Sequence, residues 1–336
     1  MSEMSFCGKK EDVHLNWMDL LKGIGICLVI IGHCHYLFLP IKKYIYGFHM
    51  PLFFIINGYL FNQNYSFSTF LVKKTKRYLI PYFVLCFINF FIVFCISIIT
   101  KDIFTLKKYL FGIFYSIGKT EYMPNCSPLW FLTALFFTSL IFYFSRQVKE
   151  KYYFFLMILF AIIGSLLSKF CLFRLIWNLD VSFMGVFFCY IGYYIRKYKI
   201  FEKMATYPLL IFVFFAIGFI FIFLNKSIVD FDTNFYGNPL LMIFGAVFTC
   251  LPLFTIAKLI HSCKFLEFLG KNTLFVLGFD YLFESFFLVG FSKFHVENRF
   301  VSFALEITVI FIIVFLSIFI WNVLKKKLNI LRYLGF

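Results

Sequence analysis

The chain has 336 residues, of which 62% are hydrophobic and only 14% are charged. A soluble domain carries about 25% charged residues, and here the apolar residues form runs of roughly 18 or more, the length that crosses a hydrocarbon core. This composition excludes an ordinary soluble domain and predicts an all-α polytopic membrane bundle. Basic loops that face anionic lipid explain most of the net charge of +16, so we expect lipid and not nucleic acid as the partner of these charges.

The apolar runs predict about ten transmembrane helices with short connecting loops. In chain order they are expected at residues 18–38, 44–61, 79–99, 129–145, 152–168, 176–195, 207–224, 237–257, 272–290 and 301–323. The longest loop is expected near 100–128. We predict three regions: an N-terminal cytoplasmic tail at 1–16, a membrane domain at 17–324, and a basic cytoplasmic C-terminal tail at 325–336.

The distribution of Lys and Arg predicts the orientation of the bundle. With the N-terminus in the cytoplasm, the loops on that side carry roughly twice as many basic residues as the outer loops, in agreement with the positive-inside rule. Both termini are therefore expected to be cytoplasmic. The first residues lack the order of a signal peptide, so we expect the first helix to remain in the mature protein. The ten cysteines have neither metal-ligand spacing nor the pattern of a disulfide framework, and we predict no metal site.

Ionisable residues interrupt the first helix, where such residues are costly and usually functional. They are Asp19, Lys22, His33 and His35. Lys22 and His33 are 11 residues apart, which places them on one face, about 16 Å apart along the axis. Asp19 lies on nearly the same face, whereas His35 is turned about 200° from His33. The stripe predicts a binding site, although Lys22 snorkelling and His33 bonding to a neighbouring helix would explain it without one.

The second helix begins with the segment YGFHMPLFFIINGYLF. His49 lies at its outer end, so we expect His33 and His49 to face each other at similar depth. Pro51 is predicted to kink this helix and to free a backbone carbonyl. Asn57 lies roughly 12 Å deeper, where its amide either donates a hydrogen bond to a ligand or joins two helices.

These segments resemble a known family. MDLLKGIGICLVIIGH followed by FHMPLFFIINGYLF is similar to the acyltransferase-3 family of integral membrane acyltransferases, particularly its fucose-4-O-acetylase-like branch. Later segments agree, namely KKTKRYLIPYF at 73–83, SPLWFLTALFF at 127–137, GVFFCYIGYYIRK at 185–197 and FLGKNTLFVLGFDYLF at 268–283. The resemblance extends from about residue 15 to 323. It depends on the basic residue ten positions before histidine, together with the proline and paired phenylalanines of the second helix.

The resemblance implies transfer of an acyl group, usually acetyl, from cytoplasmic acyl-CoA to a carbohydrate hydroxyl in a bacterial cytoplasmic membrane. His33 matches the essential histidine of the family, Lys22 the basic residue before it, and His49 the histidine of the FHMPLFF form. Asn57 stands where serine is common, and Asp280 stands near a position where histidine is often found. We expect acetyl-CoA as a donor substrate and no permanently bound cofactor. Capsule, O-antigen, exopolysaccharide and lipid-linked sugars all remain candidate acceptors, and no esterase-like domain is expected after the tenth helix.

The chemistry of acyl-CoA fits the stripe on the first helix. Its phosphates would meet the cationic end, and its thioester would reach the deep imidazole. Neutral His33 would act as a general base toward the sugar hydroxyl or as a covalent acyl carrier. A basic cluster near the third helix adds candidate phosphate contacts, although the positive-inside rule alone predicts it. The cluster comprises Lys73, Lys74, Lys76 and Arg77.

Two further groups are candidates for binding the substrate. Asp280 and Glu284 are four residues apart on the ninth predicted helix and share a face, where they would orient a histidine, bind sugar hydroxyls, or pair with Lys22 or Lys271. Trp130, at the outer end of the fourth predicted helix, is a candidate for stacking on a sugar ring. The commoner role of such a residue is an aromatic anchor at the membrane interface.

Two other functions suit the same composition. A transporter or flippase of a lipid-linked glycan would also place charges inside ten helices, but the sequence has neither an internal repeat nor a matching pair of broken helices. A non-catalytic scaffold for polysaccharide assembly would not need the polar stripe. Because the basic clusters are expected inside and the histidines toward the outside, we predict that the acceptor enters from the outer face. The sequence leaves the oligomeric state open.

Overall fold

The computed structural model describes residues 16–62, 64–100, 103–123, 125–171, 173–291 and 298–327. Within this part of the chain, helices account for nearly all of the regular structure, and the one strand-like pairing is an isolated antiparallel bridge between Asp230 and Phe235. The all-α prediction is therefore confirmed. The predicted N-terminal tail, apart from Asn16, and residues 328–336 of the predicted C-terminal tail lie outside the described residues.

Seven segments of the described chain are long and apolar enough to cross a membrane. They are Asn16–His33, Phe67–Cys95, Ser127–Ser145, Glu150–Phe170, Ile176–Lys197, Pro239–Ile260 and Arg299–Val323. A further apolar helix, Pro208–Leu224, is slightly shorter. The chain is thus a polytopic membrane protein. Each of the ten predicted ranges contains helix, but three of them, 44–61, 207–224 and 272–290, have no counterpart among these seven segments.

The first half of the chain departs from prediction in several helices and loops. Its helices are α1 (Asn16–His33), α2 (Leu39–Tyr46), α3 (His49–Tyr59), α4 (Phe67–Lys74), a π-helical turn η1 (Thr75–Leu79), α5 (Ile80–Thr100) and α6 (Ile103–Tyr115). The helix predicted at 44–61 is divided at Gly47 and Phe48. Pro51 falls in the first turn of α3, where a missing N–H needs no partner, so the predicted kink is wrong. The predicted loop at 100–128 contains α6.

The second half follows the predicted order more closely. It contains the 3-10 turn η2 (Ser127–Leu129), α7 (Trp130–Ser145), α8 (Glu150–Phe170), the 3-10 turn η3 (Ile176–Asn178), α9 (Leu179–Lys197), α10 (Ile200–Ala205), α11 (Pro208–Leu224), α12 (Pro239–Ile260), α13 (Lys264–Lys271), α14 (Thr273–Phe291) and α15 (Arg299–Lys327). The short helices α10 and α13 occupy predicted loops. Local sequence sets several boundaries: Pro208 begins α11, and the Asn238 side chain accepts hydrogen bonds from the first N–H groups of α12.

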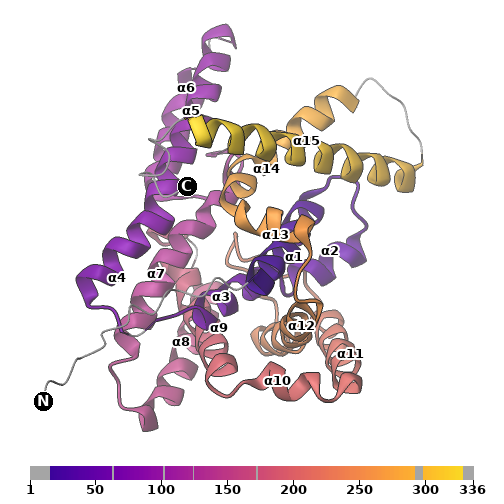
Figure 1. Ribbon diagram of the computed structural model, residues 1–336. Helices are drawn as coiled ribbons and strands as arrows, with labels where there is room; N and C mark the ends of the chain where they lie inside the picture. The colour runs from indigo at the N-terminus through magenta and orange to yellow at the C-terminus, as the bar shows by residue number, and fades with distance from the viewer. Residues whose placement is uncertain are drawn as a thin grey trace, which may run out of the picture.

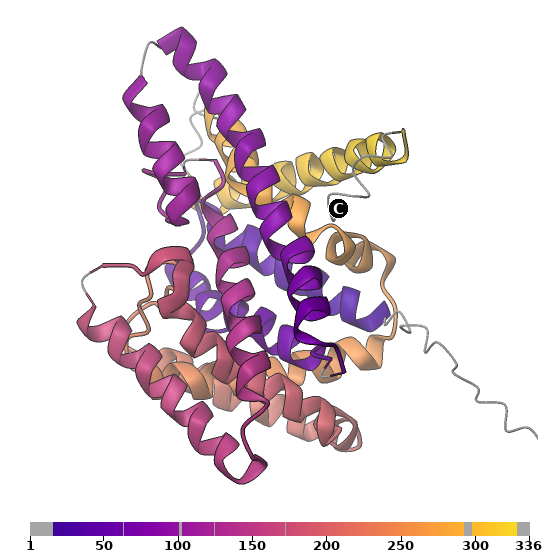
Figure 2. The same cartoon turned by 90° about the vertical axis from the view of Figure 1, so that its left-hand side faces the viewer.

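The helices surround α1, which lies inside the bundle (Figure 1). It packs along α13 on one side and contacts α3, α12 and α14 on others. Helices α7, α8 and α9 form one group, α11 and α12 form an antiparallel pair, and α15 lies crosswise over α14 (Figure 1). Helices α5 and α6 extend past the remainder of the bundle (Figure 2).

Glycines allow the close approach of α3 to α9. A Cβ atom at Gly58 would lie 1.9 Å from the carbonyl oxygen of Cys189, and one at Gly192 would lie 1.9 Å from that of Ile55. Any larger residue at either position would collide with backbone. Small residues of this kind let membrane helices pack tightly without a hydrophobic driving force between them. The contact fixes α3, and with it His49 and Asn57, against the bundle.

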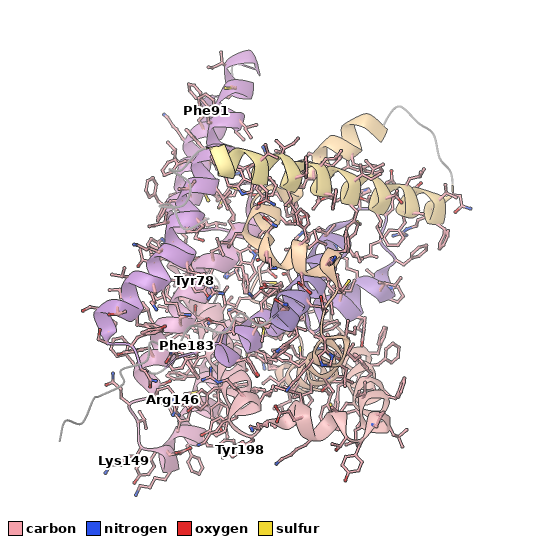
Figure 3. The ribbon with its side chains drawn as sticks, in the orientation of Figure 1. Tyr78, Phe91, Arg146, Lys149, Phe183 and Tyr198 are labelled. Atoms are coloured by element: carbon pink, nitrogen blue, oxygen red, sulfur yellow. The ribbon has the colours of Figure 1, made fainter. Side chains whose placement is uncertain are left out.

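The outside of the bundle is apolar. Phe91 on α5 is 64% exposed and lies on the outer side of its helix (Figure 3), and Phe212 on α11 is 72% exposed. Apolar surface of this extent on many helices is a liability in water but suits contact with lipid tails. Polar side chains are instead gathered inside, where they form the candidate site.

Candidate functional site

A cavity of about 450 Å³ lies beside α1. The lining residues of α1 are Asp19, Lys22, Ile26, Val29 and His33. Their spacing of three or four residues defines one face of a helix. The structure therefore brings the polar stripe on α1 together along one wall of a single cavity. We call its two extremes the basic end, which contains Lys22, and the histidine end, which contains His33.

The basic end gathers cations from three parts of the chain. The Lys22 ammonium lies 3.0 Å from the Asp19 carboxylate, and Lys74, Arg77 and Lys271 also line the cavity. Arg77 is exposed, as expected of a residue at an entrance. Four cations against one lining carboxylate leave this end positive and suited to phosphate.

Asn57 organises this end of the cavity. Its side-chain oxygen accepts hydrogen bonds from Lys74 Nζ and from the Tyr78 hydroxyl, each at 3.0 Å, and its Nδ2 donates to Ser139 Oγ at 3.0 Å. Asn57 thus connects α3 with α7 and with the segment that carries the basic cluster. It also lines the cavity, so the two interpretations offered by the sequence are compatible.

A π-helical turn orients the basic cluster. Pro81 has no N–H, so the carbonyl of Arg77 loses its usual helical partner. Ile80 donates its N–H to the carbonyl oxygen of Thr75, five residues back, and not to that of Lys76. π-Helical turns inside α-helices are frequent at functional sites. The wider turn brings Lys74, Arg77 and Tyr78 to the cavity together.

The histidine end contains two imidazoles with defined hydrogen-bond partners. His33 Nδ1 contacts the Asp280 carboxylate, and the Tyr281 ring lies 5.0 Å from the His33 ring. His49 Nδ1 lies 2.9 Å from the carbonyl oxygen of Ile45, to which only an N–H can donate. In both histidines the Nδ1 contact leaves Nε2 as the nitrogen that accepts a proton. His33 and His49 both line the cavity.

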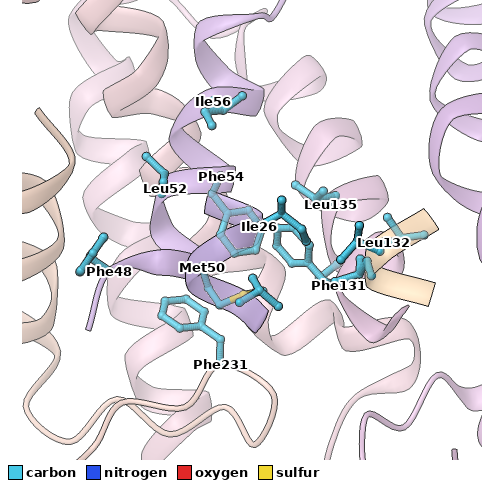
Figure 4. Close-up of a cluster of buried hydrophobic side chains, with 14 of the residues drawn as sticks. Ile26, Phe48, Met50, Leu52, Phe54, Ile56, Phe131, Leu132, Leu135 and Phe231 are labelled. Carbon is cyan, nitrogen blue, oxygen red and sulfur yellow. The ribbon is translucent and has the colours of Figure 1, made fainter. Parts of the chain in front are cut away.

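Apolar side chains separate the two ends. Ile26, Met50, Ile56, Phe131 and Leu135 all line the cavity, and they belong to a buried cluster contributed by α1, α3 and α7 (Figure 4). A passage of this kind excludes water and accommodates an apolar or uncharged chain. Its low polarity also strengthens electrostatic interactions at both ends.

The loop between α11 and α12 closes the histidine end. Asp230 and Asp232 line the cavity together with Ser127 and Trp130. Burial beside Asp230 raises the pKa of Asp232 well above its usual range. Trp130 is 4% exposed, so its interpretation as an anchor at the membrane interface is wrong. Its indole belongs to the wall of the cavity.

The candidate residues from the sequence divide into three groups. Those that line the cavity are Asp19, Lys22, His33, His49, Asn57, Lys74, Arg77 and Trp130. Asp280 does not line the cavity but contacts His33. The predicted pairing of Asp280 with Lys22 is wrong, because Lys22 pairs with Asp19. Lys271, the other proposed lysine partner, lies 3.9 Å from Glu267. Glu284, Lys73 and Lys76 do not line the cavity; the Lys73 ammonium lies over the Tyr65 ring at 3.6 Å.

His35 lies away from the cavity, but for a different reason from the one predicted. Helix α1 ends at His33, so the expected rotation of 200° along a continuing helix does not apply. His35 is exposed in the turn that follows. Glu306 on α15 is fully buried and accepts hydrogen bonds from the backbone N–H groups of His35 and Tyr36, at 2.7 and 3.0 Å. These bonds hold the turn that follows α1 in place.

Sequence reasoning missed several lining residues, including Tyr46, Tyr78, Asp230, Asp232 and Tyr281. A possible signal was the pair of carboxyls in the segment DFDTNF, which is unusual in a chain this apolar. Glu306 was missed as well. It is a carboxylate inside the tenth predicted helix, and ionisable residues within a membrane span are usually functional, as was argued for the first helix.

The described residues contain no group of three or more His, Cys, Asp and Glu side chains that could hold a metal ion.

A charged cavity inside a bundle of apolar helices long enough to cross a membrane is the arrangement of a polytopic membrane protein with a buried polar cavity. The family model described as an acyltransferase domain matches residues 15–324, nearly the whole chain. The protein therefore belongs to the acyltransferase-3 family and is a membrane acyltransferase. No curated protein and no solved structure matches it.

Proposed function

We propose that the protein is an O-acetyltransferase of the fucose-4-O-acetylase-like branch in a bacterial cytoplasmic membrane. It moves an acetyl group from cytoplasmic acetyl-CoA to a hydroxyl of a cell-surface or lipid-linked carbohydrate. The observation that supports this proposal is the continuity of one cavity, which joins a cluster of cations to the His33–Asp280 pair. A long ligand with an anionic end and a reactive end matches both extremes.

The donor is proposed to lie along α1. Its phosphates contact Lys22, Lys74 and Arg77, because cationic side chains form charge-assisted hydrogen bonds with phosphate. The uncharged pantetheine arm follows the apolar passage. Lys22 and His33 are about 16 Å apart along the helix axis, a distance that an extended arm can cover. This places the thioester at the histidine end.

His33 is proposed to act as the general base. Nε2 takes the proton of the sugar hydroxyl while the hydroxyl oxygen attacks the thioester carbonyl. The carbon–sulfur bond then breaks, and the proton passes from His33 to the leaving thiolate of CoA. Asp280 holds Nδ1–H and stabilises the imidazolium that forms between these steps. His49 Nε2 accepts a hydrogen bond from the acceptor hydroxyl and orients it.

A covalent route uses the same atoms in a different order. His33 Nε2 attacks the thioester first and CoA thiolate leaves. The sugar hydroxyl then attacks the acetyl-imidazole, the carbon–nitrogen bond breaks, and the hydroxyl proton passes to His49 Nε2 and from there to the CoA thiolate. An acetyl-imidazole intermediate would accumulate when acetyl-CoA is supplied without an acceptor. Mass spectrometry of rapidly quenched protein distinguishes the two routes.

The test is transfer of label from radioactive acetyl-CoA to glycan by the purified protein in lipid nanodiscs. His33→Ala should lower transfer by about 10²–10⁴-fold, the usual contribution of a general base. His35→Ala is the matched control because His35 lies two residues further along, outside the cavity, and should retain transfer. Near-normal transfer by folded His33→Ala protein would contradict the proposed mechanism. Movement of glycan without transfer of label would favour a flippase instead.

Sidedness requires a separate test. Sealed vesicles of known orientation receive acetyl-CoA on the cytoplasmic side only, and a membrane-impermeant acceptor is added to one side at a time. The proposal expects acetylation when the acceptor is on the opposite side from CoA. Acetylation only in the compartment that contains CoA would instead indicate a cytoplasmic acyltransferase.

A further inference from the structure

The loop between α11 and α12 is a tight turn that holds two carboxyls side by side. Asp230 and Phe235 exchange two backbone hydrogen bonds of 2.7 Å. The Asp230 carboxylate accepts hydrogen bonds from the N–H of Asp232 at 3.0 Å and from the hydroxyl of Thr233 at 3.0 Å. These bonds shape the turn from within and fix the position of the Asp230 carboxylate.

Buried aromatic residues anchor the turn in the bundle. Phe231 is 2% exposed, and its ring packs against those of Phe54, Phe188 and Tyr236. Asp230, Phe231 and Asp232 all line the cavity beside His33. A connecting loop therefore supplies part of the wall at the histidine end.

Asp232 carries an unsatisfied oxygen in this wall. Its Oδ1 is buried and has no hydrogen-bond partner within the described part of the chain. A Cβ atom at Gly118 would lie 1.7 Å from this oxygen and 2.6 Å from Cδ1 of Trp130, so only glycine leaves the oxygen and the indole side by side. Buried polar atoms are almost always paired, so Asp232 is a carboxyl that the protein itself leaves unsatisfied in the wall of the cavity.

The nearby cations do not neutralise the turn within the cavity. Arg174 and Lys119 interact with Asp232 electrostatically, but Arg174 is held by Asp180 at 2.6 Å, and neither cation lines the cavity. The lining cations are at the basic end, about 16 Å away along α1. The histidine end is therefore the acidic end of the cavity, with Asp230 and Asp232 in its wall and Asp280 behind His33.

We propose that Asp230, Asp232 and Trp130 form the subsite for the acceptor sugar, and that this subsite accepts an uncharged or amino sugar and rejects a sugar that carries a carboxylate. The proposal rests on the proposed function, since it names the class of acceptor. Sugar hydroxyls donate to the carboxyl oxygens, and the ring stacks on the indole. A sugar carboxylate would stand against the carboxyls in a site of low polarity, where repulsion between like charges is strong.

The test compares ligands that share one sugar ring and carry a neutral, a cationic or an anionic group. p-Nitrophenyl glycosides are used in the gluco and galacto series, each as the neutral sugar, the 2-amino sugar and the uronic acid. Binding to purified protein in nanodiscs is measured by calorimetry without acetyl-CoA. In the wild type, the neutral and amino glycosides of the preferred series should have a Kd about tenfold or more below that of the uronide. A tenfold ratio of Kd values corresponds to about 1.4 kcal/mol of binding free energy.

The double variant Asp230→Asn/Asp232→Asn removes both carboxyl groups, and with them the acidic character of the turn, and keeps the shapes of the side chains. In this variant, the ratio of the Kd of the uronide to the Kd of the neutral glycoside should fall toward one. Glu121→Gln is the matched control, because Glu121 is an exposed acid outside the cavity, and it should retain the wild-type preference. The single variant Asp232→Asn, which leaves the Asp230 bonds that shape the turn intact, should lie between the two.

Equal binding of all three charge forms by the wild type would overturn the proposal, as would absence of binding by every glycoside. An unchanged preference in both folded Asn variants would overturn it too. The proposed function fails separately: if the charge preference is found but acetyl-CoA is never consumed with any acceptor, the sugar subsite stands and the acetyltransferase proposal falls.

Discussion

Replacement of Asp280 by asparagine tests how the histidine end works. The Asp280 side chain is 3% exposed, and it contacts Nδ1 of a His33 side chain that is itself 15% exposed. An aspartate accepts the Nδ1 proton and leaves Nε2 as the base. An asparagine amide can donate to Nδ1 instead, which favours the tautomer with its proton on Nε2, the form that cannot act as a base. Asp280 is thus a positioning residue.

The expected loss for Asp280→Asn is about 10²–10⁴-fold in kcat, or about 2.7–5.5 kcal/mol of transition-state stabilisation. KM for acetyl-CoA should change little, because the phosphates bind at the other end of the cavity. Asp280→Glu, which keeps the acceptor, should recover part of kcat. Glu150→Gln, an exposed acid at the start of α8 and outside the cavity, should behave as the wild type.

The assay follows CoA thiol release with a glycoside acceptor, alongside thermal unfolding to confirm that each variant is folded. A folded Asp280→Asn protein with a kcat near that of the wild type would refute the reasoning. A variant that lost acetyl-CoA binding in parallel with kcat would show that Asp280 supports the fold of the whole cavity.

Three further predictions concern the basic end, the helix packing and the acidic turn. Lys22→Ala should weaken CoA binding about 10–100-fold in calorimetry because a charge-assisted phosphate contact is lost, whereas Lys22→Arg should largely retain it; equal losses would indicate a structural role. Gly192→Ala should cost about 1–3 kcal/mol, since its Cβ would meet the Ile55 carbonyl, and an unchanged melting temperature would contradict the close contact. The pKa of Asp232 is higher in the folded than in the unfolded chain, so ionisation removes stability as pH rises above about 4. Asp232→Asn should therefore raise the melting temperature more at pH 7.5 than at pH 4.5, and an equal rise at both would refute the raised pKa.

The stripe on α1 was predictable because it depends only on local helix geometry. Once residues 16–33 are helical, the spacing of Lys22 and His33 puts them on one face whatever surrounds them. The same local rule predicts that Asp280 and Glu284 share a face of their helix, but it does not predict which neighbouring helix that face contacts. Contact with His33 depends on how α14 packs against α1, which the sequence of either helix does not state.

Features that depend on distant contacts were not predicted. The break between α2 and α3 lies inside a continuous apolar run. Gly47, at the break, lies against the Ile222 side chain of α11, where a Cβ atom would come within 2.8 Å of Cγ1, and the local sequence does not show this contact. The entry of Asp230 and Asp232 into the cavity depends on the burial of Phe231 by residues of other helices. Hydropathy places such a loop outside the bundle.

The most direct test of the proposed mechanism is the position of the donor. A cryo-electron microscopy structure with a non-hydrolysable acetyl-CoA analogue would show it. The phosphates should lie beside Lys22, Lys74 and Arg77, the arm should follow the apolar passage, and the carbonyl carbon should lie within about 4 Å of His33 Nε2, close enough for reaction. Phosphates bound elsewhere, or a thioester remote from His33 while the analogue is fully bound, would contradict the proposed mechanism.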